Sequence, residues 1–335
     1  MAQKQPTILD LAQRAGVSKS LVSLVMRGSS QVSDARRRAV LEAAEELGYR
    51  PNAMARGLAE QRTAIIGCVI SDLHNPFFAE VFDGIEEVAR REEYRTLLAT
   101  GFLDPYREEA AVATLVELRV DALVTVGPVA DVDALLQAGE STPLVAVGYH
   151  GTSDHVDTVS NDDYTGFQTI LDHLVDLGHS DIATIYSTSA AGGTGRHQAY
   201  LDRMRHHGLE DYIAEFEGDF TRTGGRRAME SILANRNLPT GVVVANDFAA
   251  VGALDAIEEA GYSAPDDISV TGYDDVEVAG SQRINLTTIR QDREDLGRIA
   301  ATSIIERLRG EREETIHKLL PNELVVRGTT GPPRG

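Results

Sequence analysis

Eight short apolar runs, alternating with stretches of helical periodicity, recur from residue 64 onward and limit what this chain can fold into. The runs are AIIGCVIS, RTLLAT, ALVTVG, LVAVGY, DIATIYS, AEFEGD, GVVVAN and ISVTGY. Such alternation is typical of α/β domains with parallel sheets, and eight runs predict two similar lobes. In these folds ligands bind at the carboxyl ends of the strands, in the crevice between the lobes.

Length and composition set further limits. At 335 residues the chain exceeds one compact core, so we expect two or three domains. No apolar run approaches the roughly 20 residues of a membrane span, and the polar start MAQKQPT lacks a signal-peptide apolar stretch. We therefore expect a cytoplasmic protein with no membrane partner. The single cysteine, Cys68, lies inside an apolar run, which excludes a disulfide or a cysteine metal cluster and predicts core packing.

Charge is distributed unevenly along the chain. Residues 1–62 hold ten Lys or Arg and six Asp or Glu, a net charge of +4, whereas the remainder carries −24. The overall charge of −20 alone argues against nucleic acid, because affinity for the phosphate backbone comes largely from basic side chains. A basic end on an acidic body instead indicates a nucleic-acid-binding segment at the N-terminus.

The first sixty residues predict short helices with capping signals. Thr7 precedes a helix that Gly16 ends, Ser18 begins a second helix, and a third spans 33–47. Two helices joined by a short turn fit the helix-turn-helix geometry, in which the second helix lies in the major groove. Three ordinary helices of a larger bundle are the alternative. A further helical stretch at 53–59, followed by polar residues, predicts a hinge before the core.

The segment TILDLAQRAGVSKSLVSLVMRGSSQVSDARRRAVLEAAEELGYRPNAMARGLAE resembles the headpiece and hinge of the lactose-repressor (LacI) family. The segments NPFF, LVDLGHSDIA, VANDFAAVGAL, DISVTGYDD and LTTIRQD resemble the same family, so the similarity spans nearly the whole chain. The resemblance implies an all-α helix-turn-helix headpiece at 1–48, a hinge helix and linker at 49–62, and a ligand-binding core at 63–335. That core would have the α/β fold of periplasmic binding proteins, with two lobes built on parallel sheets. Lobe 1 would comprise about 63–161 plus 290–320, and lobe 2 about 162–289 plus 321–335.

The resemblance also implies which residues contact DNA. They are Thr7, Ser18, Lys19, Ser20, Ser23, Leu24, Arg27, Ser33, Asn52, Leu58 and Ala59. The threonine and the serines other than Ser20 would contact phosphates, and Lys19 and Ser20 would read base edges in the major groove. Leu24 departs from the polar residue that relatives often place there, so contact at that position would be apolar, for instance with a thymine methyl. Leu58 matches the family's minor-groove wedge; the alternative is a packing residue of a linker helix.

A second set of residues falls, by the same resemblance, in the crevice of the core. It comprises Phe77, Phe78, Arg196, Phe220, Asn246, Asp274 and Gln291. Asp274 would accept paired hydroxyl donors, the planar fork of Arg196 would hold vicinal oxygens or a carboxylate, and Asn246 would offer both donor and acceptor. The phenylalanines would cover the ligand faces, and Gln291 would lie where the chain crosses between the lobes.

Aspartates that follow strands have a simpler interpretation as helix caps. We interpret Asp247 and Asp275 mainly as caps, and Asp162 as either a cap or a ligand contact. Adjacent His206 and His207 diverge by about 100° on a helix and lack a third ligand, so we expect no metal and no cofactor. Nucleophile-elbow, Walker, HExxH and kinase motifs are absent from the sequence, and GGTGRHQ lacks the third glycine of a dinucleotide fingerprint. We expect no enzyme.

The expected partners follow from the resemblance. One headpiece reads only half of a palindromic operator in double-stranded DNA, which implies a homodimer. The expected function is a transcription repressor of carbohydrate-utilisation genes that a small sugar inducer releases, and a purine-type co-repressor is the alternative. A sugar-binding protein without DNA function conflicts with the basic headpiece and the missing signal peptide. The tail after Val326, RGTTGPPRG, is predicted to be flexible and shows no apolar heptads, which favours a dimer over a tetramer.

Overall fold

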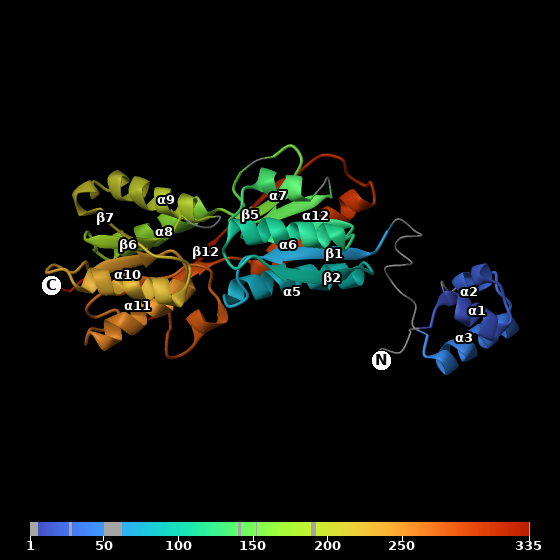
Figure 1. The fold of residues 1–335 in the computed structure, drawn as a ribbon. Helices are drawn as coiled ribbons and strands as arrows, with labels where there is room; N and C mark the ends of the chain where they lie inside the picture. Colours follow the sequence, from blue (N-terminus) through green and yellow to red (C-terminus); the bar gives the residue numbers. More distant parts are fainter. Residues whose placement is uncertain are drawn as a thin grey trace. The chain divides into compact units, whose positions relative to one another are not determined.

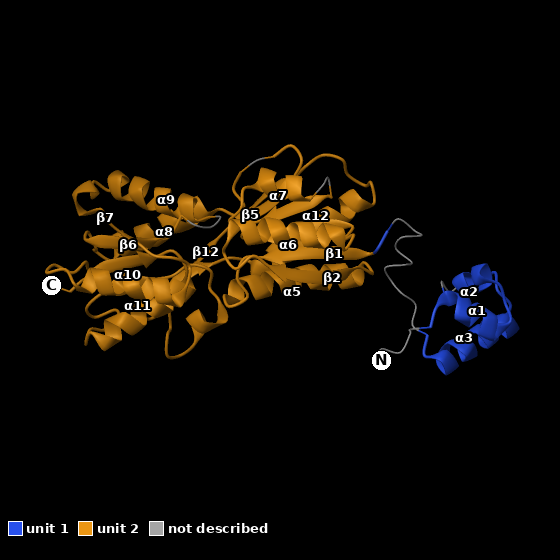
Figure 2. Ribbon diagram, viewed as in Figure 1, with its two compact units in different colours: residues 1–63 blue, residues 64–335 orange. Residues whose placement is uncertain are grey.

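The computed structural model describes residues 6–26, 29–49, 62–139, 142–151, 153–188 and 192–334. Two compact units divide the chain, Met1–Thr63 and Ala64–Gly335 (Figure 2). The described ranges contain no helix that is long and apolar enough to cross a membrane.

The first unit packs three helices around a small apolar core. They are α1 (Ile8–Ala15), α2 (Lys19–Met26) and α3 (Asp34–Leu47). Thr7 and Asp10 form a capping box at the start of α1, and Gly16 ends it in the left-handed conformation at φ 66°. Gly48 ends α3 in the same way. The three predicted helices are confirmed. Their buried core contains Leu11, Ala12, Val22, Val25, Val32, Val40, Ala43 and Ala44.

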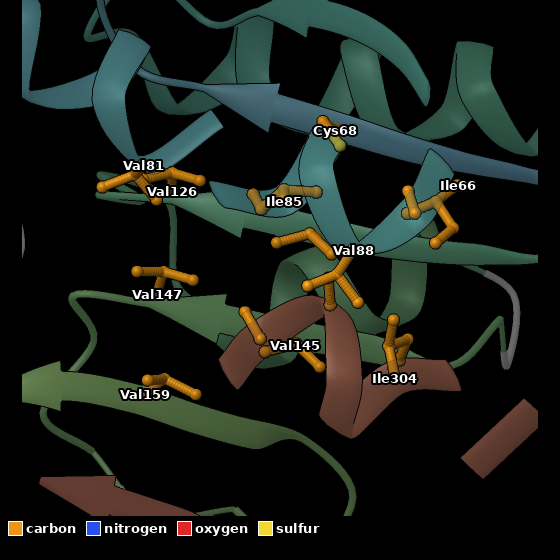
Figure 3. Close-up of a cluster of buried hydrophobic side chains, with 14 of the residues drawn as sticks. Ile66, Cys68, Val81, Ile85, Val88, Val126, Val145, Val147, Val159 and Ile304 are labelled. Carbon is orange, nitrogen blue, oxygen red and sulfur yellow. The ribbon is translucent and has the colours of Figure 1, made fainter. Parts of the chain in front are cut away.

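One lobe of the second unit, lobe 1, is built on a six-stranded parallel sheet (Figure 1). In spatial order the strands are β11 (His317–Leu320), β5 (Asp157–Asn161), β4 (Leu144–Val147), β3 (Ala122–Val126), β1 (Ile65–Ile70) and β2 (Arg95–Thr100). One face packs against α5 (Pro76–Arg91) and α12 (Arg293–Leu308), and the other against α6 (Pro105–Glu117) and α7 (Val132–Ala138). Cys68 lies fully buried in the first of these cores, as predicted (Figure 3).

The other lobe, lobe 2, has a four-stranded parallel sheet. Its strands, in spatial order, are β7 (Ala214–Glu217), β6 (Ile182–Tyr186), β8 (Gly241–Val244) and β9 (Ser269–Thr271). One face packs against α10 (Arg222–Leu233) and α11 (Asp247–Glu259), and the other against α8 (Asp163–Asp176) and α9 (Gly193–His206). Short 3-10 helices lie at Glu210–Tyr212 and Glu277–Gly280. The predicted α/β class with two parallel-sheet lobes is confirmed.

The chain passes between the lobes three times. The passages run from β5 to α8, from β10 (Thr288–Arg290) to α12, and from β11 to β12 (Glu323–Val325), and β10 pairs with β12 antiparallel. Hydrogen bonds join the first and third passages: the Asp162 amide donates to the Leu320 carbonyl at 3.0 Å, and the Asn322 side chain donates to the Asp162 carbonyl at 2.6 Å. The three passages are therefore joined to one another by hydrogen bonds and are not independent linkers.

The C-terminal tail is docked, which corrects the prediction of a flexible segment. The Val270 amide donates to the Thr329 carbonyl at 2.8 Å, so the tail binds along β9. Thr329 also accepts a hydrogen bond from the Thr287 amide, and the His179 ring contacts the Gly331 carbonyl at 2.8 Å. Threonine hydroxyls and backbone groups provide this attachment, so a search for apolar heptads misses it.

Glycine pairs bring helix backbones close together in both lobes. A Cβ on Gly84 of α5 would collide with the Glu294 carbonyl of α12, and one on Gly297 of α12 would collide with the Val81 carbonyl of α5. In lobe 2 the same reciprocal relation joins α10 and α11 through Gly225 and Gly252. Each lobe thus has one helix pair whose separation tolerates only hydrogen at the crossing.

We predict that Gly84→Ala lowers the stability of the core by roughly 1–3 kcal/mol, because backbone atoms of α12 would have to move. The control is Gly195→Ala in α9, where an added Cβ meets nothing within 4 Å. That change should stabilise by up to roughly 1 kcal/mol through helix propensity. Thermal unfolding of both full-length variants measures the difference, and equal midpoints would contradict the close packing.

Candidate functional site

A cavity of about 560 Å³, its open mouth included, lies between the lobes at the carboxyl ends of their strands. All seven crevice residues inferred from the sequence line it. The complete lining is Asn75, Phe77, Phe78, Leu103, Gly127, Gly148, Asn161, Asp163, Arg196, Phe220, Asn246, Asp274, Gln291 and Leu296. The mixture of aromatic walls with a few polar groups is typical of small-molecule sites.

Local structure positions the aromatic wall on the side of lobe 1. Asn75 caps α5 by accepting the Phe77 amide at 3.0 Å, with Pro76 in the first turn, so the two phenylalanines begin the helix at the cavity. Their rings pack edge to face with centroids 5.3 Å apart. Gly127, at φ 62°, follows β3 and leaves room for Phe78, because a Cβ there would press on the Phe78 ring.

Arg196 is the most constrained group of the site. Its Nε and Nη2 donate to Oδ1 of Asp163 at 3.1 and 2.9 Å, and Nη1 donates to the Ala245 carbonyl at 2.7 Å. The guanidinium carbon lies 3.9 Å from the centre of the Tyr273 ring, and Nη2 is 3.8 Å from an Asp274 oxygen. Because three of the five N–H groups are used inside the protein, two remain for a bound molecule.

Sequence reasoning missed Asp163. Asp162 caps α8 by accepting the Thr165 amide at 3.0 Å, while Asp163 turns to Arg196 and to His150, whose Nε2 is 2.7 Å away. Burial opposes ionisation of Asp163, but Arg196 and His150 outweigh it and hold the pKa of this carboxyl below its ordinary value. Two consecutive acids after a strand were the available signal, and they do not reveal which one faces the cleft.

Asp274 is held in an unusual backbone conformation. Its φ of 120° is rare for a residue with a side chain, and the residue is 4% exposed. Gln291 donates to Oδ1 at 2.5 Å. Burial, which Arg196 only partly offsets, raises the pKa of Asp274 to about 7.

The interpretation of Asp247 and Asp275 as helix caps is wrong. Asn246, not Asp247, caps α11, and Asp247 is buried where it accepts from Thr288 Oγ1 at 2.5 Å and from the Val276 amide at 2.9 Å. Asp275 forms an ion pair with Arg290 at 2.8 Å and another with Arg327 at 2.5 Å.

Asn246 has less hydrogen-bonding capacity to offer than the sequence implies. Its Oδ1 accepts the Ala249 amide at 2.9 Å as the α11 cap, and its Nδ2 donates to the Phe220 carbonyl at 3.2 Å. One amide hydrogen is left for a bound molecule. The same bond links Asn246 to the half-buried Phe220, so the two cavity residues position each other.

The first unit presents a mixed surface along α2. Lys19 and Ser20 are exposed at its start, whereas Leu24 is half-buried and packs partly against the helical core. Ser18 accepts the Leu21 amide at 3.2 Å, and Ser33 makes no side-chain cap bond. The remaining inferred DNA residues are Thr7, whose hydroxyl is engaged with Asp10, the half-buried Ser23, and Arg27, Asn52, Leu58 and Ala59, which lie outside the described residues.

We predict that Asp274→Asn alters how stability depends on pH. The pKa of Asp274 rises to about 7 from an ordinary 3.8, so the folded chain retains a proton that the unfolded chain has released. The stabilisation is complete below the unfolded value and is lost as pH rises through 7. Asparagine stays neutral, so the variant should lose less stability than the parent between pH 5 and pH 8, a difference of roughly 2–6 °C in thermal midpoint.

Asp163→Asn is the matched control from the same cluster, and its expected outcome differs. Because the pKa of Asp163 is lowered, its stabilisation is present throughout pH 5–8 and lost only as pH falls through the folded value. Removing this charge should destabilise across the whole range, by up to roughly 3–5 kcal/mol, since Arg196 remains buried with a weaker partner. Parallel pH profiles for Asp274→Asn and the parent would refute the assignment for Asp274.

Comparisons with known proteins bear on both units. Residues 7–52 match the family model of bacterial regulatory proteins, lacI family, and residues 171–330 match that of a periplasmic binding protein-like domain. The HTH-type transcriptional repressor PurR of Erwinia tasmaniensis is 34% identical over 92% of this chain and 92% of its own length. The ribose operon repressor of Haemophilus influenzae is 31% identical over 96% of this chain and 97% of its own.

Solved structures that resemble this chain point to the same family. The lac repressor dimer bound to operator and the anti-inducer ONPF is 30% identical, with a TM-score of 0.83 over 98% of this chain and 100% of that one. A regulator from Enterococcus faecium with bound ribose is 26% identical, with a TM-score of 0.72 over 80% of this chain and 99% of that one. The chain belongs to the lacI family of bacterial regulatory proteins and is a DNA-binding transcription repressor of that family.

Proposed function

We propose that this repressor acts in the cytoplasm on genes of carbohydrate utilisation, as a homodimer on a palindromic operator, and that a small sugar in the cleft releases it. The observation that carries the proposal is the composition of the cleft. Two carboxylates, one arginine and four side-chain amides line a cavity whose walls also include three phenylalanines. Hydroxyl groups of a sugar both donate and accept, and its C–H faces pack on aromatic rings.

Coupling to DNA follows from the location of the cleft. Asn161, Asp163 and Gln291 lie where the chain passes between the lobes, so a molecule bound there contacts the segments that set the lobe arrangement. A ligand that binds one arrangement better shifts the population toward it. The hinge at 49–62 would transmit that shift to the headpiece at 1–48.

DNA recognition is assigned to the headpiece residues inferred from the sequence. Lys19 and Ser20 would read base edges from the exposed start of α2, and Leu58 would act as the minor-groove wedge. Leu24 is half-buried, which suits an apolar contact made at the edge of the helical core rather than a hydrogen bond.

The homodimer has support on lobe 1. β2 is an edge strand with Leu98 exposed, and Leu73 and Phe102 are exposed in the loops that follow β1 and β2. Bonds from Gly101 to the Ile70 carbonyl and from Leu103 to the Ser71 carbonyl keep the two loops adjacent. An edge strand beside exposed apolar side chains is suited to contact with a second copy.

We predict that Lys19→Ala weakens operator binding by roughly 1–3 kcal/mol, through the loss of a base contact. Lys318→Ala is the control, because it removes the same charge from an exposed position of β11 in the core. Fluorescence anisotropy with the operator and with random DNA separates the effects. Equal losses for both variants would show that charge alone, rather than recognition, is involved.

We predict that a neutral sugar weakens operator binding by roughly 5- to 150-fold, the usual size of such coupling. A gel shift of the full-length chain on its own promoter region, with sugars and purine bases added separately, measures it. Binding that guanine or hypoxanthine strengthens, while every sugar is inert, would replace the carbohydrate inducer with the purine-type co-repressor. Because the chain is similar to proteins named PurR, the experiment must include purine bases as well as sugars.

A further inference from the structure

Three buried side chains form a hydrogen-bonded line across the floor of the cleft. Asn161 ends β5, Gln291 follows β10, and Asp274 follows β9. Nδ2 of Asn161 donates to Oε1 of Gln291, and Nε2 of Gln291 donates to Oδ1 of Asp274 at 2.5 Å. The three residues are 2%, 3% and 4% exposed, in that order along the line. We call this line the amide relay.

The charge of Asp274 sets the direction of the amide relay. Above a pH of about 7, the pKa of Asp274, its carboxylate is ionised and only accepts hydrogen bonds, so Gln291 must present its NH₂ group to it. The Gln291 carbonyl then faces Asn161, which in turn must present its own NH₂ group. The orientation of both amides thus follows from bonding chemistry.

The hydrogen bonds of the amide relay do not involve one of its side-chain oxygens. Oδ1 of Asn161 is buried and has no hydrogen-bond partner in the described part of the chain, and Asn161 lines the cavity. A buried acceptor without a partner costs free energy, and such groups are rare in folded proteins. A hydroxyl group of a bound molecule would satisfy it.

The basic side chain that lines the cleft, Arg196, and the nearby Arg293 are already engaged in ion pairs. Arg196 is bonded to Asp163, and Arg293, which donates to the Asp274 carbonyl, is paired with Glu80 at 2.6 Å. Among the lining residues that the structure describes, no basic side chain remains without an acidic partner. A phosphate or carboxylate on the ligand would therefore lie beside Asp163 and Asp274, while the charge of the lining residue Arg196 is already balanced by Asp163.

We propose that Asn161 is a specificity-determining residue whose side-chain oxygen accepts a hydroxyl proton of the effector, so that the cleft selects uncharged polyhydroxy molecules over phosphorylated or acidic ones. This inference rests on the proposed carbohydrate effector. Asp163 and Asp274 add further acceptors, and the one free amide hydrogen of Asn246 and the two free N–H groups of Arg196 supply donors to hydroxyl oxygens.

The first test needs no variant. Isothermal titration of the full-length chain at pH 8, where Asp274 is ionised, compares D-ribose with ribose 5-phosphate and D-glucose with glucose 6-phosphate and gluconate. We expect the neutral member to bind at least tenfold more tightly within whichever series binds. Tighter binding of the phosphate or the acid would overturn the inference while leaving a carbohydrate effector intact.

The second test isolates Asn161. Asn161→Ala should weaken binding of the neutral sugar by roughly tenfold or more. It should also erase the parent's discrimination against one deoxy analogue of that sugar, because the hydroxyl that Asn161 contacts would no longer matter. Asn322→Ala is the matched control: Asn322 is another amide at a lobe passage with an unpartnered Oδ1, and it is not part of the cavity lining.

The possible outcomes distinguish the role of Asn161 from the proposed carbohydrate effector. Unchanged affinity and unchanged deoxy discrimination in a folded Asn161→Ala chain would refute the role of Asn161 alone. Equal weakening by Asn322→Ala would show that the effect comes from the lobe passages rather than from a ligand contact. Binding of guanine with no response to any sugar would overturn the proposed function, and the inference would fall with it.

Discussion

The ion pair between Arg196 and Asp163 is the interaction on which the cleft depends. Both groups are almost fully buried, and removing charges from water is costly unless each finds a partner and further hydrogen bonds. The Ala245 carbonyl and His150 supply those bonds. Because Asp163 begins α8 and Arg196 lies on α9, the pair also fixes how two helices of lobe 2 meet the cavity. A buried polar surface results, on which electrostatic interactions with the polar groups of a ligand are stronger than in water.

The sequence pattern predicts some strands of the core and not others, and the reason is physical. All eight apolar runs became β1 to β4 and β6 to β9. The inner strands are covered on both faces and are therefore apolar along most of their length, whereas the edge strands β2 and β7 keep exposed polar residues. The sequence pattern did not predict β5 or the three short strands near the C-terminus. DTVSN and HKLL contain polar residues whose partners, such as Arg312 for Asp157, lie more than a hundred residues away. Local periodicity carries no information about such pairings.

The cleft was likewise only partly predictable from the sequence. Family resemblance brought together all seven crevice residues, yet it did not distinguish which atoms remain available. The side-chain oxygen of Asn246 is already used as a helix cap, and Asp163 rather than Asp162 faces Arg196. These details depend on backbone angles within a single turn, which residue identity does not set. The unpartnered oxygen of Asn161 likewise emerges only from counting donors and acceptors in three dimensions.

The glycine-mediated contact of α5 with α12 has a consequence for biosynthesis. The two helices are separated by some two hundred residues, whereas α10 and α11 of lobe 2 follow each other with one strand between them. As the chain leaves the ribosome, the apolar face of β1, β3 and β4 and the helix α5 are made early, but the second helix that covers this face, α12, emerges only near the end. Lobe 2 meets no such delay for its own helix pair. The core of the first lobe is therefore complete only after residues near the C-terminus have been synthesised.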